Sequence, residues 1–198
     1  MNASATVPDV RQHILDVAHP LLLAKGFTAV GLAEVLAAAQ VPKGSFYHYF
    51  GSKEAFGEAL LDSYFARYLA HTDALLGGAG TAAQRLTAYF EDWLDSQTGD
   101  EAQSRCPVVK LGAEVSDLSD AMRAALERGT GRVTERLARS IAEGQADGSL
   151  GHLTEDAATL GRTLYQNWLG ASLLAKILRQ RAPLDTAMAN TRSLFGLH

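Results

Sequence analysis

Apolar residues recur at helical spacing from the start of the chain. Val10 and Ile14 lie one turn apart at the head of a segment whose apolar positions share one face, as in an amphipathic helix. Asp9 suits the N-cap of this helix, and Gly26 suits the residue that ends it. Pro20 falls inside the pattern and removes one backbone hydrogen bond. We therefore expect a first helix that is bent or split at the proline.

The same periodicity predicts further helices joined by short turns. They are expected at about residues 32–39, 43–50, 53–69, 81–97, 107–113, 117–145, 155–180 and 184–195. Residues 77–80, Gly-Gly-Ala-Gly, form the clearest linker-like stretch and close the fourth helix. No segment alternates with period two for long enough to predict a strand. The chain is therefore predicted to be all-α.

The first four helices have the layout of a helix-turn-helix module, in which short helices precede a longer one. In the segment 43–50, Phe46 and Phe50 stand four residues apart and are expected to be buried. Lys43 and Tyr47 form another such pair, and Ser45 and His48 are three residues apart; these polar-tipped groups are expected to project away from the phenylalanines.

Two further residues favour the interpretation that this helix binds a nucleic acid. Gly44 allows the backbone to approach a phosphate closely. Lys53 begins the next helix and can reach a phosphate as a point charge. If this pattern is considered alone, an ordinary amphipathic helix with a solvated polar face explains it at least as well as DNA binding does.

Charge and composition do not favour DNA binding by themselves. The 198-residue chain has 18 Lys and Arg against 22 Asp and Glu, a net charge of −4, so it is not coated with positive charge. No apolar run reaches the ~18–20 residues that span a bilayer, and the first residues lack the basic and apolar regions of a signal peptide. We therefore expect a cytoplasmic protein with no membrane partner.

The order of residues 39–54 favours DNA binding over an ordinary amphipathic helix. It runs Ala39-Gln40-Val41-Pro42-Lys43-Gly44-Ser45-Phe46-Tyr47-His48-Tyr49-Phe50-Gly51-Ser52-Lys53-Glu54. This string closely resembles the recognition segment of TetR-type transcriptional regulators, and the resemblance covers residues 9–70. Gln40 stands where that family usually has a turn glycine, Pro42 replaces the usual Ser or Thr cap, and His48-Tyr49 inverts the usual order.

The resemblance implies a helix-turn-helix DNA-binding domain at residues 8–68, with its motif at about 31–50. It also implies a helical bundle at residues 80–198 that senses an effector and dimerises. A homodimer would then repress transcription by binding double-stranded operator DNA. The DNA-contacting residues implied are Lys43, Gly44, Ser45, Tyr47, His48 and Lys53. The candidate dimer seam is 155–180, where small residues permit close helix approach, although intramolecular packing could use them equally.

The single cysteine, Cys106, excludes an internal disulfide. Pro107 suits a first helical position, which would place Cys106 at the N-cap, near the positive end of the helix dipole. Arg105 and Lys110 are close in sequence, and such surroundings favour the thiolate. The alternative is that Cys106 is a small buried apolar residue.

The segment 104–115, with Trp168-Leu169-Gly170-Ala171 and Ala175-Lys176-Ile177, resembles the NemR-like branch of TetR repressors. That branch senses electrophiles and reactive chlorine through a cysteine, and a lysine near the C-terminal end pairs with or bonds to the oxidised cysteine. The resemblance implies that Cys106 reacts with an electrophile or oxidant that acts as inducer. Lys176 is at the matching lysine position.

Other chemistry finds little support in the sequence. There is no Walker loop, His-Glu-x-x-His, Cys-x-x-Cys or Gly-x-Ser-x-Gly motif, and the six histidines lack metal-ligand spacing. We expect no cofactor, no metal site and no catalytic residue. Three alternatives stay open: a regulator induced by a reversible small ligand, a thiol-dependent enzyme using Cys106 without an evident general base, and a helical adaptor or carrier that does not bind DNA.

Overall fold

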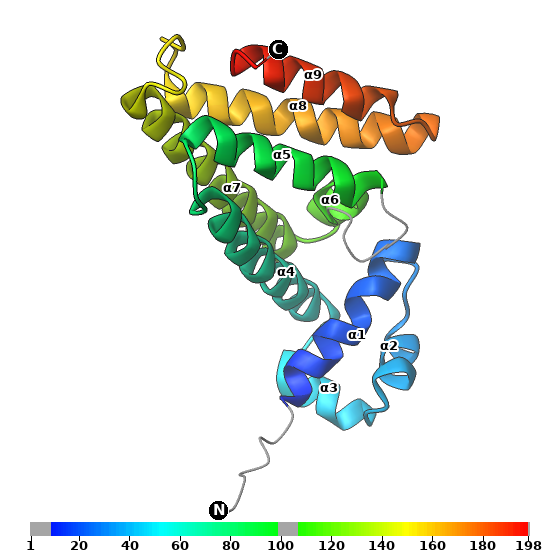
Figure 1. The fold of residues 1–198 in the computed structure, drawn as a ribbon. Helices are drawn as coiled ribbons and strands as arrows, with labels where there is room; N and C mark the ends of the chain where they lie inside the picture. Colours follow the sequence, from blue (N-terminus) through cyan, green and yellow to red (C-terminus); the bar gives the residue numbers. More distant parts are fainter. Residues whose placement is uncertain (1–8, 99–106, 198) are drawn as a thin grey trace, which may run out of the picture.

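The computed structural model describes residues 9–98 and 107–197, and every regular element in these ranges is an α-helix, as predicted. The helices are α1 (Val10–Lys25), α2 (Leu32–Ala39), α3 (Lys43–Phe50), α4 (Lys53–Leu76), α5 (Ala82–Thr98), α6 (Pro107–Leu118), α7 (Asp120–Asp147), α8 (Ala157–Leu178) and α9 (Ala182–Leu194). Helices α1–α3 form one end of the molecule, α8 and α9 lie together at the other, and α4 runs between the two ends (Figure 1).

The sequence pattern placed most helix starts within a residue or two, and the larger differences lie at helix ends. Helix α4 continues to Leu76, and α6 continues to Leu118, because Leu111 and Val115 keep one face of α6 buried past Gly112. Helix α1 runs through Pro20 without the expected split. The buried side chains on both sides of the proline hold α1 in place, and this packing outweighs one lost hydrogen bond.

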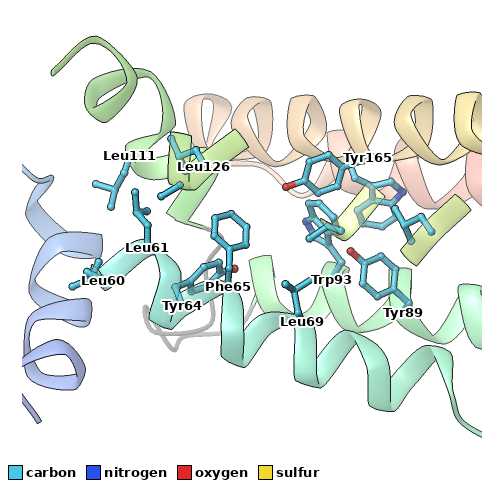
Figure 2. Packing of buried hydrophobic residues seen from close by; sticks show 14 of the residues in the cluster. Leu60, Leu61, Tyr64, Phe65, Leu69, Tyr89, Trp93, Leu111, Leu126 and Tyr165 are labelled. Atoms are coloured by element: carbon cyan, nitrogen blue, oxygen red, sulfur yellow. The ribbon is translucent and has the colours of Figure 1, made fainter. Parts of the chain in front are cut away.

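Buried apolar side chains form one continuous cluster through the described residues, part of which Figure 2 shows. Helix α7 packs against both α4 and α8. A Cβ atom built at Gly129 on α7 would lie 2.2 Å from the ring of Phe65 on α4. At Gly161 on α8, it would lie 3.0 Å from the backbone nitrogen of Ala138 on α7. Both glycines therefore set how closely these helices approach.

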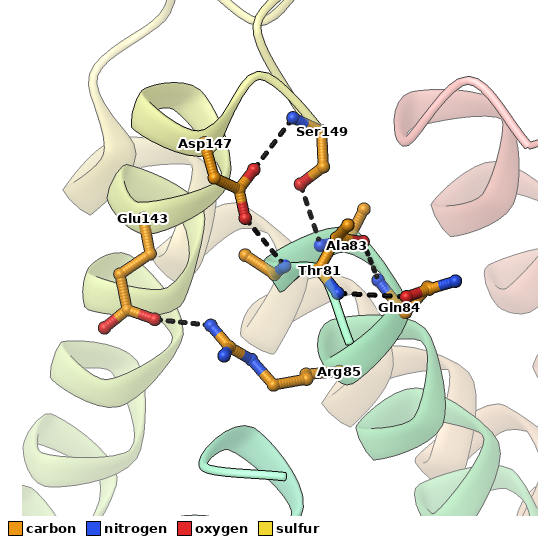
Figure 3. A network of polar contacts seen from close by, with 8 residues as sticks. Thr81, Ala83, Gln84, Arg85, Glu143, Asp147 and Ser149 are labelled. Carbon is orange, nitrogen blue, oxygen red and sulfur yellow. Dashed lines mark hydrogen bonds and ion pairs between the residues drawn. The ribbon is translucent and has the colours of Figure 1, made fainter. Parts of the chain in front are cut away.

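Polar contacts attach the start of α5 to the end of α7 (Figure 3). The Asp147 carboxylate accepts a hydrogen bond from the backbone N–H of Ala82 at 3.0 Å, and the Ser149 hydroxyl accepts one from that of Ala83 at 3.2 Å. Arg85 and Glu143 add an ion pair of 2.6 Å. These contacts satisfy two amides of the first turn of α5, which have no partner within their own helix.

Gln40 ends α2 in the left-handed region, with φ 55° and ψ 40°. A side chain in this conformation costs about 1–2 kcal/mol, and glycine offsets part of that gain through its greater entropy when unfolded. Gln40→Gly is therefore expected to raise the free energy of unfolding by about 0.5–1 kcal/mol in urea titrations. Gln40→Ala keeps a Cβ and should bring no gain; an equal gain from both variants would contradict the explanation.

Candidate DNA interface and sensor site

Helix α3 has one face in the core and one in solvent, as the spacing of its residues predicts. Phe46 is fully buried, and its ring centroid lies 5.1 Å from that of Phe50 and 5.2 Å from that of Phe56 on α4. These ring contacts attach α3 to the start of α4. The opposite face of α3 is thereby held outward, with Tyr47 48% exposed.

The exposed face of α3 carries most of the residues expected to contact DNA. The ammonium of Lys43 lies 5.8 Å from the ring centroid of Tyr47, the cation–π distance expected for residues four apart. Lys43, Gly44 and His48 are exposed and Ser45 is half-buried. No atom lies within 4 Å of a Cβ built at Gly44, so the backbone there is open to a large partner.

The N-termini of α2 and α3 lack side-chain caps. Gly31 precedes α2 and Pro42 precedes α3, and neither provides a side-chain hydrogen bond to the first turn. By contrast, α1, α4, α7 and α8 are capped by the side chains of Asp9, Ser52, Ser119 and Asp156. Helix α9 also lacks a side-chain cap, so this feature is not confined to α2 and α3. The open first-turn amides of α2 and α3 can nevertheless donate to phosphate oxygens.

Lys53 has a structural contact that the sequence did not indicate. Its ammonium donates a hydrogen bond to the carbonyl oxygen of Val30 at 3.0 Å and lies 5.1 Å from the ring centroid of Phe27. Lys53 therefore joins the start of α4 to the turn before α2. Arg11, which the sequence reasoning did not place at the interface, is exposed on α1 with its guanidinium 5.5 Å from the ring centroid of Phe50.

A carboxylate from α6 holds the turn between α1 and α2. The two oxygens of Glu114 accept hydrogen bonds from the backbone N–H groups of Thr28 at 2.7 Å and Phe27 at 3.2 Å. Burial alone would raise the pKa of Glu114, but the hydrogen bonds from Thr28 and Phe27 and the charge of Lys110 lower it overall. We call this contact the Glu114 clamp. It directly joins α6 to the helix-turn-helix end.

The expected sensor residues divide between described and undescribed parts of the chain. Cys106 and Arg105 lie outside the described residues. Lys110 on α6 and Lys176 on α8 line the same cavity, of about 970 Å³. Arg179 and Arg181 also line it, and none of the described residues on its wall is acidic. The structure thus brings both lysines to a cationic cavity beside α6, the helix that follows Cys106 in sequence.

Helix α8 has one face in the core of its own chain and one in solvent. Trp168 is fully buried, and its indole N–H donates to the Thr191 hydroxyl at 3.0 Å. Ser172, also buried, accepts a hydrogen bond from the indole of Trp93 at 3.1 Å. The exposed large apolar residues of α8 are Leu173, Leu174, Ile177 and Leu178. Of the predicted seam, Trp168, Ala171 and Ser172 therefore face the core of their own chain. Gly170 and the aliphatic residues lie on the exposed side.

Comparison with known proteins identifies the family. Residues 14–60 match the profile of bacterial regulatory proteins of the tetR family, and residues 82–191 match the tetracyclin repressor-like C-terminal domain. The HTH-type transcriptional repressor NemR of Escherichia coli (strain K12) is 41% identical over 192 residues, which are 96% of each chain. The repressor DhaR of Mycobacterium sp. (strain GP1) is 35% identical over 178 residues, 89% of this chain and 87% of DhaR.

Solved structures agree with these relatives. The crystal structure of E. coli NemR in its reduced form matches with a TM-score of 0.88 and 42% identity, covering 93% of this chain and 96% of that chain. Within the described residues, no helix is long and apolar enough to cross a membrane. With both domains matched and a relative sharing two-fifths of its residues over nearly its full length, the chain belongs to the TetR family of bacterial transcriptional regulators.

Proposed function

We propose that this protein is a transcriptional repressor that binds operator DNA as a homodimer and leaves it when Cys106 reacts with an electrophile or oxidant. Residues 8–68 would read DNA, and residues 80–198 would sense the inducer and dimerise. The observation that carries DNA binding is the outward face of α3, held in place by the buried phenylalanines and flanked by uncapped helix N-termini.

The residues of this face divide into two roles. Ser45, Tyr47 and His48 have hydrogen-bonding groups that suit base edges in the major groove, where sequence is read. Lys43 and the open backbone at Gly44 suit phosphates, which position the protein without specifying sequence. Local placement of these groups thereby substitutes for the positive charge that the chain lacks overall.

We infer a dimer because a single recognition helix can make only a few contacts to the bases. Helix α3 has only 8 residues, so a single copy offers few base contacts. Dimers of helix-turn-helix proteins place two such helices about 34–36 Å apart, one DNA turn. We propose that the exposed apolar face of α8, within 155–180, contributes to the seam, because an apolar patch at one end of the molecule favours burial against a second copy.

Sensing is supported by the cationic cavity beside α6. Positive groups such as Lys110 favour the thiolate, the nucleophilic form of cysteine. The Cys106 thiolate would add to the activated double bond of an electrophile such as N-ethylmaleimide, forming a C–S bond while the neighbouring carbon takes a proton from water. With hypochlorous acid, the sulfur would take chlorine and release hydroxide. The amine of Lys176 would then displace chloride and lose a proton, leaving a sulfur–nitrogen bond.

Substitutions on α3 and α4 test the two kinds of DNA contact in mobility-shift titrations. Tyr47→Phe removes one hydroxyl and is expected to cost about 1–3 kcal/mol at one base position, with less effect on other sequences. Lys53→Ala should weaken binding to all sequences alike and lower its salt dependence, since it removes positive charge and loosens the turn at Val30.

Arg139→Ala provides the matched control, because Arg139 is an exposed cation on α7, outside both α3 and the proposed seam within 155–180. The DNA probe is the region upstream of the protein's own gene, with an isolated half-site as competitor. A half-site bound as tightly as the full palindrome would refute the dimer. Sequence-independent effects of Tyr47→Phe would refute its role in base reading.

A further inference from the structure

Arg11 places a cation beside the C-terminal end of α3. It is the second residue of α1 and is exposed. Its guanidinium lies 5.5 Å from the ring centroid of Phe50, the last residue of α3. Figure 1 shows the start of α1 beside α3, at the end of the molecule away from α8 and α9. Arg11 therefore belongs to the same end of the protein as the exposed face of α3.

Arg11 and Lys43 differ from the other two cations of residues 9–60. Lys25 forms an ion pair with Glu34, and Lys53 donates a hydrogen bond to a backbone carbonyl. Among the described residues, neither Arg11 nor Lys43 has an ion-pair or hydrogen-bond partner, and each lies against an aromatic ring. Both charges are therefore available to an anionic partner.

The acidic side chains around Arg11 already have partners. Asp16 and Asp62 line a groove with Arg11, and each of these carboxylates forms an ion pair with another arginine. Asp9, two residues before Arg11, accepts a hydrogen bond from a backbone N–H as the N-cap of α1. Because a paired charge acts less strongly at a distance than an unpaired one, these acids oppose a phosphate beside Arg11 only weakly.

The ring of Phe50 prepares Arg11 for a contact with phosphate. Phe50 is 7% exposed, so its ring is a fixed support. A guanidinium against an aromatic face retains its N–H donors, which form a planar fork that matches phosphate oxygens. Since the ring restricts the side chain before DNA binds, less rotamer entropy is lost on binding. Arg11 is therefore suited to donate two hydrogen bonds to one phosphate.

Arg11 and Lys43 stand at opposite ends of α3. Lys43 is the first residue of this helix, and Arg11 contacts the last. The 8 residues of α3 span about 12 Å at the usual helical rise. The major groove of B-DNA is about 12 Å wide, and the phosphates of one strand follow each side of it. Cations at both ends of α3 can therefore face phosphates of opposite strands.

We propose that Arg11 is a phosphate-binding residue of the DNA interface, and that Arg11 and Lys43 bind opposite strands on the two sides of the groove that α3 enters. The proposal rests on the proposed function. Phosphate contacts carry no sequence information, but they fix the orientation of the protein on the duplex. Arg11 therefore affects base reading by Tyr47 only through the position of α3.

The first test measures how DNA affinity depends on salt, with the region upstream of the protein's own gene as probe. Each lost phosphate contact lowers the slope of log K against log salt by about 0.9, so Arg11→Gln is expected to lower it by that amount per chain. Arg11→Lys keeps the charge and should keep the slope. Lys25→Gln removes an exposed cation from the same helix and is the matched control, with an unchanged slope.

A purely structural role of Arg11 gives a different result. If Arg11 only packs on Phe50, Arg11→Gln weakens binding or lowers the melting temperature but leaves the slope unchanged, and this outcome would overturn the proposal. Arg11→Met keeps a long apolar stem against the ring and removes the charge. It should lower the slope as Arg11→Gln does, and it covers the case in which Arg11→Gln fails to fold.

The assignment of strands has its own test. Methylphosphonates replace single phosphates by neutral groups along each strand of the DNA segment that the protein protects. The phosphate bound by Arg11 should matter to wild type and to Lys43→Gln but not to Arg11→Gln. The phosphate that Lys43→Gln ignores should lie on the other strand. Positions on the same strand for both variants would overturn the two-strand arrangement.

Failure of the proposed function is distinguishable from failure of this inference. Equal affinity of the wild type for the upstream region and for a scrambled duplex would refute the proposed function. Phosphate contacts also support non-specific binding, so the slopes of wild type and Arg11→Gln on the scrambled duplex would still decide whether Arg11 binds phosphate. Equal slopes there would overturn the inference.

Discussion

The Cys106→Ser protein is expected to bind operator DNA with wild-type affinity and to keep it after treatment with N-ethylmaleimide or hypochlorite. Serine preserves size and polarity but supplies no thiolate, so neither the carbon–sulfur nor the sulfur–nitrogen bond can form. The treated wild-type protein should lose about 5–150-fold in affinity, the usual range of coupling between two sites. Mobility-shift titrations of both proteins, before and after treatment, measure the difference.

Lys176→Ala separates the two classes of inducer. If the lysine amine displaces chloride from the oxidised sulfur, this variant should lose more of its response to hypochlorite than to N-ethylmaleimide. Arg139→Ala, which removes an exposed cation from the neighbouring helix α7, should respond as the wild type does. Release of DNA from treated Cys106→Ser would show that the cysteine is not the sensor, and a reversible ligand would become the better explanation.

Glu114→Ala is expected to weaken the link between inducer and DNA. The carboxylate is the acceptor for two backbone N–H groups at the turn between α1 and α2, and hydrogen bonds to a charged group contribute about 1.5–3 kcal/mol each. Without these hydrogen bonds, a movement of α6 would no longer be transmitted to the helix-turn-helix end of the protein. The loss of operator affinity caused by N-ethylmaleimide should therefore shrink about tenfold in this variant.

Two comparisons distinguish the clamp from a general effect of charge on α6. Asp117→Ala removes an exposed carboxylate from the same helix and should leave the response to N-ethylmaleimide unchanged. Glu114→Gln keeps one acceptor oxygen and should give an intermediate response. A full inducer response in Glu114→Ala would exclude the clamp as the connection between α6 and the turn.

The clamp also predicts a pH dependence. The pKa of Glu114 is lower in the folded protein than its ordinary value. Its contribution to stability is therefore complete above the ordinary carboxyl pKa and is lost as the pH falls through the lower, folded-state value. The difference in unfolding free energy between wild type and Glu114→Ala should narrow in that acidic range and stay constant near neutrality.

Local patterns in the sequence determined the helices and the exposed face of α3. Residues three and four apart meet on one side of a helix, so the spacing of Phe46, Tyr47 and Phe50 was enough to tell the buried side of α3 from the exposed side. The capping residue Asp9 acts on an amide three residues away, and this cap is present. The family followed from the ordered string around α3.

Sequence reasoning was incomplete where packing or a distant partner added to a local signal. Pro20 predicted a bend or a split in α1, and the structure shows no split, because buried residues on both sides of the proline hold the helix together. Lys53 was interpreted as a phosphate contact, yet its ammonium also donates to the carbonyl of Val30, 23 residues earlier. No pattern within one helix contains information on such a partner.

Tertiary structure alone decided the connections between the two ends of the protein. The Glu114 clamp joins residues separated by 86 and 87 positions. Lys110 and Lys176 line one cavity although they lie on different helices, and a second cavity takes its walls from α1, α4 and α5. Helical periodicity states which face of each helix is buried but not which helix covers it. That pairing depends on how all the apolar faces pack together, as at Gly129 and Gly161, and it exists only in the folded chain.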